Sequence, residues 1–427
     1  MVIMFKELFD FSYIFPSAKH RQWLFVFMLI MLVYSLNIIP EDIPLGIVLL
    51  FCLLSPIKLV FFFFTFYSLF ESVATFSSGI TANVVLQLVI FLRVLLFLVN
   101  SHETLKAKMA GLKIIYGAYW LLYAIMAIII WGNVTGLAFF FRIIISIMVI
   151  WFVLTRINSY NYWKATFHIL VFSVLCSVIY GFFNDTSLER EIEGLAGGSA
   201  SQLFGSLGTT RLGMFLVIAL NYPLYFVQEK KIKIGLILLL TILTFMTVSM
   251  TAVAVLFLAF GIYLISLKQV KKILLMPFFI LPLLVGTYSW WSSLSFVQPV
   301  VMRINVILYQ ESIGDMDMAT SGRELIQELY IKDFNNRNFV EKTVGIFNPD
   351  NFDLRKGKLS HNTYIDIMAY NGILGIILLL LYCYKTVFFY RKTELFYPIL
   401  SMKLVLLVAA YTVSIYTSVY WTWFLFM

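Results

Sequence analysis

The sequence predicts an all-α membrane protein, a polytopic bundle of helices that crosses the bilayer many times. Hydrophobic residues make up 61% of the chain and charged residues only 12%, whereas soluble proteins carry about 25% charged residues. The apolar residues are gathered in many segments that approach the roughly 20 residues a helix needs to cross a bilayer. We therefore expect a single membrane domain over residues 1–427, with roughly 12–14 spans.

Basic residues determine the expected topology of the first half of the chain. Lys19 and Arg21 place the N-terminus in the cytoplasm, because cytoplasmic loops are enriched in lysine and arginine. Two short spans broken near Pro56 keep the lysines of segment 106–113 on the cytoplasmic side, and one long span would not. The expected spans lie at about 23–38, 43–70 (in two pieces), 81–99, 114–132, 136–155 and 165–182.

The second half of the chain contains two loops on the outer, periplasmic side. The smaller loop covers 183–210, and the larger one covers 292–362. Lysine and arginine clusters follow the spans that end inside, as the same rule requires. The expected spans lie at about 212–227, 234–249, 251–267 and 273–290, followed by a helix that begins at His361 and one or two spans after Leu395.

The large outer loop is expected to be folded rather than a linker. Ser321 and Glu324 have the spacing of a capping box, in which two side chains satisfy free backbone N–H groups at a helix start. Apolar residues at helical spacing follow over 325–334. The pattern predicts a capped amphipathic helix, packed on the membrane domain, with Arg323 in its first turn. An arginine held in this way suits recognition of a phosphate group.

A histidine at the mouth of a membrane helix is the most distinctive polar feature of the chain. His361 stands between a polar segment and a long apolar one, and Ser360 or Asn362 is available to cap the helix. The positive helix end keeps an imidazole neutral and attracts anions such as a diphosphate. This arrangement predicts a general base beside a bound diphosphate. The alternative is a histidine that only caps the helix or forms hydrogen bonds at the membrane surface.

Several arginines lie on the outer side or inside spans. Arg211 directly precedes a span and shares its side of the membrane with Arg323 and His361. Alone it fits an interfacial anchor, whereas the three residues together favour a site. Arg93 and Arg142 lie within spans, where an arginine costs about 2.5–3.5 kcal/mol on insertion scales. Structural pairing and substrate contact both remain open for these two.

Metal, disulfide and nucleic-acid sites are not expected. Asp315 and Asp317 have the D-x-D spacing of a metal site in sugar-nucleotide transferases, but they fit solvated loop residues better. Their loop is expected outside the cytoplasm, whereas nucleotide sugars are supplied inside it. The net charge of +9 fits basic cytoplasmic loops rather than nucleic-acid binding. Buried free thiols are expected at the three cysteines, Cys52, Cys176 and Cys383, which lie in apolar segments.

An ordered set of motifs resembles the O-antigen polymerase (Wzy) and O-antigen ligase superfamily. Segments 360–366 and 370–375 resemble its H-N-x-[YF] … G-[IL]-[LI]-G signature. The chain departs from the family at 248–251, which has no arginine where the family often has S-x-S-R. Ser321-Gly322-Arg323 resembles the S-G-R of the family, and Val344-Gly345 resembles its short glycine element. Segments 211–213 and 221–223 resemble its earlier arginine–glycine and Asn-Pro segment, except that Tyr222 separates Asn221 from Pro223.

The resemblance implies a metal-independent glycosyltransferase of the GT-C type that needs no cofactor. Such an enzyme takes glycan from an undecaprenyl-diphosphate carrier on the periplasmic face of the bacterial inner membrane. His361 would activate the acceptor hydroxyl, while Arg211 and Arg323 would hold the diphosphate. The other residues expected to bind substrate are Arg142, Asn221, Arg303, Asn362 and Tyr364.

The expected function is polymerisation of undecaprenyl-diphosphate-linked oligosaccharide repeat units into O-antigen or another polysaccharide. Membrane lipid and a chain-length regulator protein are the other expected partners. The alternative in the same class is an O-antigen ligase that transfers the polymer to lipid A core. The alternative from another class is a flippase or exporter of lipid-linked glycan, which predicts internal symmetry and charges throughout the spans. The distinctive charges here gather in one outer loop instead.

Overall fold

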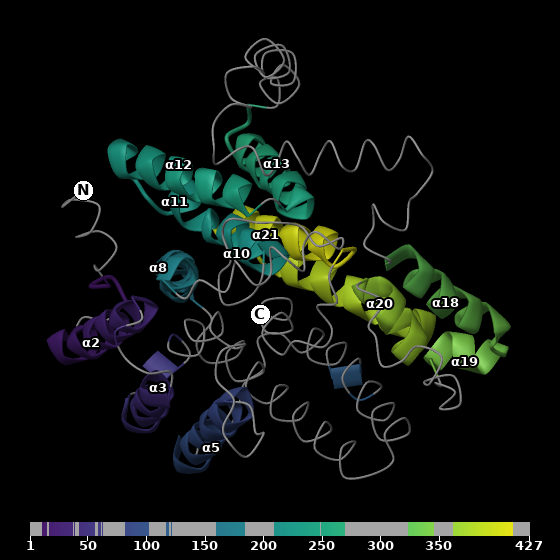
Figure 1. The fold of residues 1–427 in the computed structure, drawn as a ribbon, viewed down its shortest axis with the longest axis horizontal. Coiled ribbons are helices and arrows are strands. Elements are labelled where there is room, and N and C mark those ends of the chain that lie inside the picture. The colour runs from purple at the N-terminus through teal and green to yellow at the C-terminus, as the bar shows by residue number, and fades with distance from the viewer. Residues whose placement is uncertain are drawn as a thin grey trace.

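The fold is known from a computed structural model that describes the chain in segments: residues 11–14, 17–36, 38, 42–55, 59–60, 62, 82–101, 117–118, 121, 159–183, 209–247, 249–269, 323–345 and 362–412. Every regular element in these segments is an α-helix (Figure 1), which confirms the all-α class. Within them, Tyr160–Gly181 and Asn371–Phe389 are long and apolar enough to cross a membrane.

Most expected helices that fall in the described segments are present within a few residues. The break expected near Pro56 agrees with a helix that ends at Leu54. The expected spans at 114–132, 136–155 and 273–290 lie outside the described residues, as does most of the loop at 183–210. The helices are α2 (Ala18–Ser35), α3 (Asp42–Leu54), α5 (Ala82–Ser101), α8 (Tyr160–Phe183), α10 (Thr209–Ala219), α11 (Asn221–Tyr225), α12 (Lys230–Met246), α13 (Met250–Ser266), α18 (Arg323–Asn336), α19 (Phe339–Val344), α20 (Thr363–Phe389) and α21 (Phe396–Ala409).

Helix α10 lies at the centre of the described helices and contacts α8, α12, α13 and α21 (Figure 1). All its residues from Leu212 to Ala219 are buried, as expected for a helix that is apolar on every side. The span expected at 212–227 is divided, since α10 ends at Ala219 and α11 follows. Pro223 explains the division, because a proline cannot donate to the carbonyl four residues earlier and its ring clashes with it.

Gly213 allows α10 to approach the start of α13 closely. A Cβ atom at this position would lie 2.5 Å from the Cβ of Ala252 and 2.8 Å from Oγ1 of Thr247. Ser249 caps α13 by accepting a hydrogen bond from the backbone N–H of Ala252. The small residue therefore places the first turn of α10 beside the capped start of α13.

The helices alternate in direction, so that their ends gather at two levels. At one level the indole N–H of Trp163, at the start of α8, donates to the hydroxyl of Tyr390, at the end of α20 (3.2 Å). Lys233, at the start of α12, lies 5.0 Å from the ring centroid of Tyr263, near the end of α13. We call this level the basic end, because Lys164, Lys230, Lys231, Lys233, Lys268, Arg391 and Lys392 adjoin these contacts in the chain.

At the opposite level the starts of three helices meet the end of α21. The backbone N–H of Thr363, the first residue of α20, donates to the carbonyl of Ala410 (2.7 Å). The hydroxyls of Thr251 and Thr412 join the start of α13 to the residues after α21 (2.9 Å). Because Gly213 places α10 at the same point, we call this level the convergent end.

We predict that Gly213→Ala destabilises the protein by about 1–3 kcal/mol, the usual penalty for overpacking a tight interface. The matched control is Gly261→Ala in α13, where a Cβ atom would meet nothing within 4 Å. That control should be neutral or stabilising by roughly 0.5–1 kcal/mol, because alanine favours helix. Thermal unfolding of the purified variants measures both, and equal unfolding temperatures would contradict the close approach.

Candidate functional site

Arg211 is half-buried in the first turn of α10, at the convergent end. Each helix start carries a partial positive charge from its backbone dipoles. The start of α13 lies beside that of α10, and the start of α20 contacts the end of α21, which α10 also contacts. The end of α21 carries a partial negative charge. The hydrogen bond from the backbone N–H of Thr363 to the carbonyl of Ala410 offsets part of this charge. Among the described residues Arg211 forms no ion pair. This arrangement suits an anion.

The start of α20 is capped by Asn362, one of the two expected caps. Its Oδ1 accepts from the backbone N–H groups of Tyr364 (3.0 Å) and Ile365 (3.3 Å), and the residue is 3% exposed. The expected substrate contact of Asn362 remains a prediction beside this structural role. His361 precedes the cap in the chain and lies outside the described residues, as do Arg142 and Arg303.

Tyr364 holds the first turn of α20 against α21. Its hydroxyl donates to the carbonyl of Leu407 (2.6 Å). Burial raises the pKa of Tyr364 to about 12, so the phenol stays protonated and donates at neutral pH. The contact fixes the direction in which α20 leaves the convergent end.

Asn221 lies well away from Arg211, although both were expected to bind substrate. Asn221 is fully buried at the start of α11, and its amide donates to the carbonyl of Ile218 (2.9 Å). It follows Arg211 along nearly continuous helix, which places it about 15 Å deeper at a rise of 1.5 Å per residue. The structure therefore does not bring Asn221 to the convergent end.

The outer-loop helix expected after Arg323 is present and packs on α20. Arg323 is the first residue of α18, while its side chain and Ser321 lie outside the described residues. Tyr330 and Phe334 are 1% and 8% exposed, and α18 contacts α20. A capping box that the sequence analysis did not single out begins the next helix, α19, where Asn338 and Glu341 exchange hydrogen bonds.

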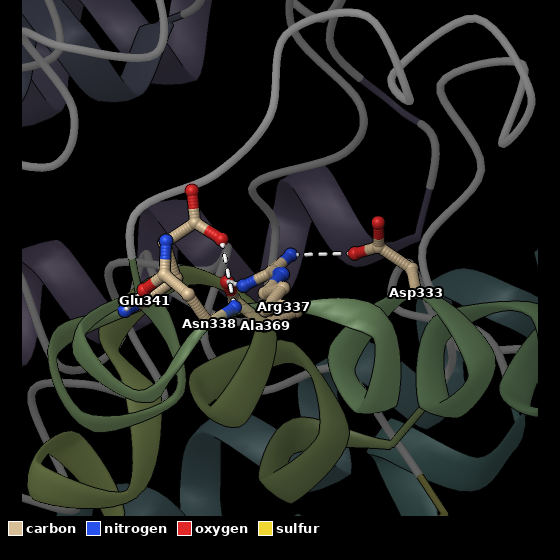
Figure 2. A network of polar contacts seen from close by, with 5 residues as sticks. All are labelled: Asp333, Arg337, Asn338, Glu341 and Ala369. Atoms are coloured by element: carbon tan, nitrogen blue, oxygen red, sulfur yellow. Dashed lines mark hydrogen bonds and ion pairs between the residues drawn. The ribbon is translucent and has the colours of Figure 1, made fainter.

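Arg337 fastens the pair of helices α18 and α19 (the outer helix pair, after the loop predicted from the sequence) to α20, and it was missed by the sequence analysis. Figure 2 shows its guanidinium between two partners, the carbonyl of Ala369 and the carboxylate of Asp333. Both N···O distances are 2.6 Å. The side chains of Arg337 and Asp333 are only 3% and 9% exposed. Removing either partner of a buried ion pair destabilises the protein strongly, because the other charge is then left buried without compensation.

Two glycines let the main chains of α19 and α20 touch. Gly372 interrupts α20 with φ of 64°, and Gly345 ends α19 with φ of 80°. A Cβ atom on Gly345 would overlap the backbone of Gly372, and one on Gly372 would overlap the carbonyl of Thr343. A helix break leaves carbonyls of the preceding turn short of helical N–H partners. Arg337 supplies a donor to one of these, at Ala369.

Other expectations concern cysteines, Arg93 and metals. Cys52, Cys176 and Cys383 are buried and free, as expected. Arg93 donates to the main-chain carbonyl of Ser55 (2.6 Å), which gives it a structural role with a carbonyl rather than a carboxylate. The acids of segment 315–317 lie outside the described residues. Within the described segments no three His, Cys, Asp or Glu side chains gather as a metal site.

Besides Arg337, two buried charged residues of the described segments were given no role from the sequence. Asp366, in the first turn of α20, is 0% exposed, and the positive helix end stabilises its carboxylate there. Lys403, within the apolar helix α21, is 1% exposed. The signal for both was an isolated charge in an apolar segment.

No protein-family model, no curated protein and no solved structure matches this chain. The function proposed below is therefore supported by the geometry of the convergent end and by the order of the motifs along the chain.

We predict that Arg337→Leu releases the outer helix pair from α20. The substitution leaves the carboxylate of Asp333 buried without a cation, at a penalty of about 3–5 kcal/mol. Limited proteolysis should then cleave segment 323–345 faster. Lys332→Leu is the matched control, because Lys332 is an exposed cation on α18, which ends directly before Arg337. Equal cleavage rates in the two variants would refute the role of Arg337.

Proposed function

We propose that this chain is a multi-pass membrane glycosyltransferase that joins polyprenyl-diphosphate-linked oligosaccharide repeat units on the outer face of the bacterial inner membrane. It would act as a polymerase of O-antigen or a related polysaccharide. The observation that supports this most is the gathering of the starts of α10, α13 and α20 around the end of α21, with Arg211 in the first turn of α10. Helix starts and arginine together are the groups that bind diphosphates in proteins.

The surface of α20 supports a membrane environment. Its candidate span, Asn371–Phe389, carries a row of exposed apolar side chains, and an apolar surface of this kind marks contact with lipid or protein. Polar residues such as His168, Asn221 and Ser401 are fully buried instead. The exposed row comprises Ile373, Ile377, Leu380, Leu381 and Tyr384, which are 41–59% exposed.

The two levels of helix ends support the orientation. The basic end carries lysines and arginines with Trp163 and Tyr390, the composition of a cytoplasmic membrane surface. The convergent end then faces the periplasm, and the N-terminus, with Lys19 and Arg21 at the start of α2, lies in the cytoplasm. This orientation agrees with the topology expected from the basic residues alone.

The proposed reaction transfers a glycan from its carrier to a sugar hydroxyl. The bond between the anomeric carbon and the diphosphate oxygen breaks as the acceptor oxygen bonds to that carbon, and His361 takes the acceptor proton. Arg211 and Arg323 neutralise the departing diphosphate. Segment 248–251 has no arginine, but Ser249 and Thr251 begin α13 there and place hydroxyl groups at the convergent end.

A second candidate function is transport of a lipid-linked glycan across the membrane. Lys403 favours it, because a charged residue buried within an apolar helix often marks an ion or proton pathway. The ligase alternative would use the same site with lipid A core as acceptor. An assay that supplies only the repeat unit separates all three functions.

We predict that the purified protein converts a synthetic polyprenyl-diphosphate repeat unit into a ladder of longer products in the presence of EDTA. His361→Ala should slow the reaction by about 10²–10⁴-fold, the usual contribution of a general base. Arg211→Ala should slow it by about 10²-fold or more, because the leaving charge is no longer offset. Lys231→Ala is the control, since it removes an exposed cation at the basic end.

The assay distinguishes the candidates by product. Transport of the lipid across a vesicle membrane without a ladder would refute the polymerase function and support the transport function. A product formed only when lipid A core is added would indicate the ligase. Full activity of Arg211→Ala would remove the proposed diphosphate contact even if a ladder forms.

A further inference from the structure

The tip of α19 exposes two apolar side chains, whereas the other residues of this helix are half-buried. Phe339 is 82% exposed, the largest value among the large apolar side chains that the structure describes, and Val340 is 58% exposed. Burying a side chain of this size is worth about 1.5–3 kcal/mol. The capping box of Asn338 and Glu341 orders this first turn, with hydrogen bonds of 2.9 and 3.3 Å. The tip is therefore an ordered apolar surface.

This tip lies at the level where the candidate span of α20 begins. The span covers Asn371–Phe389, and the end of α19 contacts α20 at Gly372. The hydroxyl of Thr343 donates to the carbonyl of Phe339 (2.8 Å), so Phe339 lies one helical turn, about 5.4 Å, from the residue that touches Gly372. Figure 1 shows α18 and α19 side by side along α20, at one extremity of the described helices.

The apolar surface of α20 continues from the same point. Ile373 and Leu374, directly after the break, are 48% and 36% exposed. Ile373 begins the row that faces lipid in the proposed orientation, and Leu374 lies next to it in the chain. Lys342, three residues after Phe339, is half-buried, and a lysine at a bilayer surface places its charge in the headgroup layer while its stem stays apolar. Aromatic side chains are likewise enriched at this depth.

We propose that Phe339 and Val340 insert into the outer leaflet of the membrane and hold the α18–α19 pair at the bilayer surface. The partner is the acyl region of phospholipid next to the exposed row of α20. The opposite face of α18, with Glu328 and Lys332 exposed, faces water. This inference rests on the membrane orientation of the proposed function.

The test is the depth of a nitroxide spin label in proteoliposomes of phosphatidylethanolamine and phosphatidylglycerol. The label is attached to Phe339→Cys, to Leu380→Cys on the exposed row of α20, and to Lys332→Cys on the water side of α18. Native cysteines are buried, and the unsubstituted protein serves as the labelling blank. Power saturation compares collisions with oxygen, which partitions into lipid, and with a water-soluble nickel chelate.

The label at position 339 should collide more often with oxygen than with nickel. Its ratio of oxygen to nickel collisions should be close to the ratio at position 380 and well above the ratio at position 332. Nickel collisions at 339 as frequent as at 332 would overturn the inference while leaving the membrane orientation intact. Protection from both reagents would overturn it in favour of a protein partner. Free access of nickel to position 380 would refute the proposed membrane orientation itself. Val340→Cys repeats the test if Phe339→Cys does not fold.

Discussion

The contact between Gly345 and Gly372 determines how the outer part of the molecule is arranged. Both residues have positive φ, and a Cβ atom on either would overlap the other main chain, so only glycine permits this approach. The break divides α20 into a first part that carries the capped start and a second part that is long and apolar enough to span a membrane. Arg337 stabilises the same contact between α19 and α20 by donating to the carbonyl of Ala369, in the turn before the break. The positions of α18, α19 and the start of α20 all depend on it.

Two arginines illustrate how environment separates structural from functional cations. Arg337 is 7% exposed and bound by a carboxylate and a carbonyl, so its charge is already used within the fold. Arg211 is half-buried in the first turn of α10, beside the start of α13, and has no ion pair among the described residues. Its charge adds to the partial positive charges of these two helix starts. That difference favours Arg211 over Arg337 as the cation for the proposed diphosphate.

Sequence patterns predicted the helices well because the apolar segment that forms each helix is a local property. The apolar segments of α5, α12 and α13 and the amphipathic helix α18 needed only composition and flanking charges. The spacing of four residues between Asp333 and Arg337 was a local signal that the sequence analysis did not use. The contact of Arg337 with Ala369, 32 residues away, leaves no local pattern. The division at Leu220 was missed because Pro223 lies inside an apolar segment. Asn221 was assigned to the site by its motif, and the length of the intervening helix places it elsewhere.

The central claim is that a diphosphate binds at the convergent end, and an experimental structure with a non-reactive polyprenyl-diphosphate analogue tests it most directly. The account predicts that the two phosphates lie against the guanidinium of Arg211, at the start of α10 beside the start of α13. Phosphates bound at the basic end, or anywhere out of contact with Arg211, would contradict it.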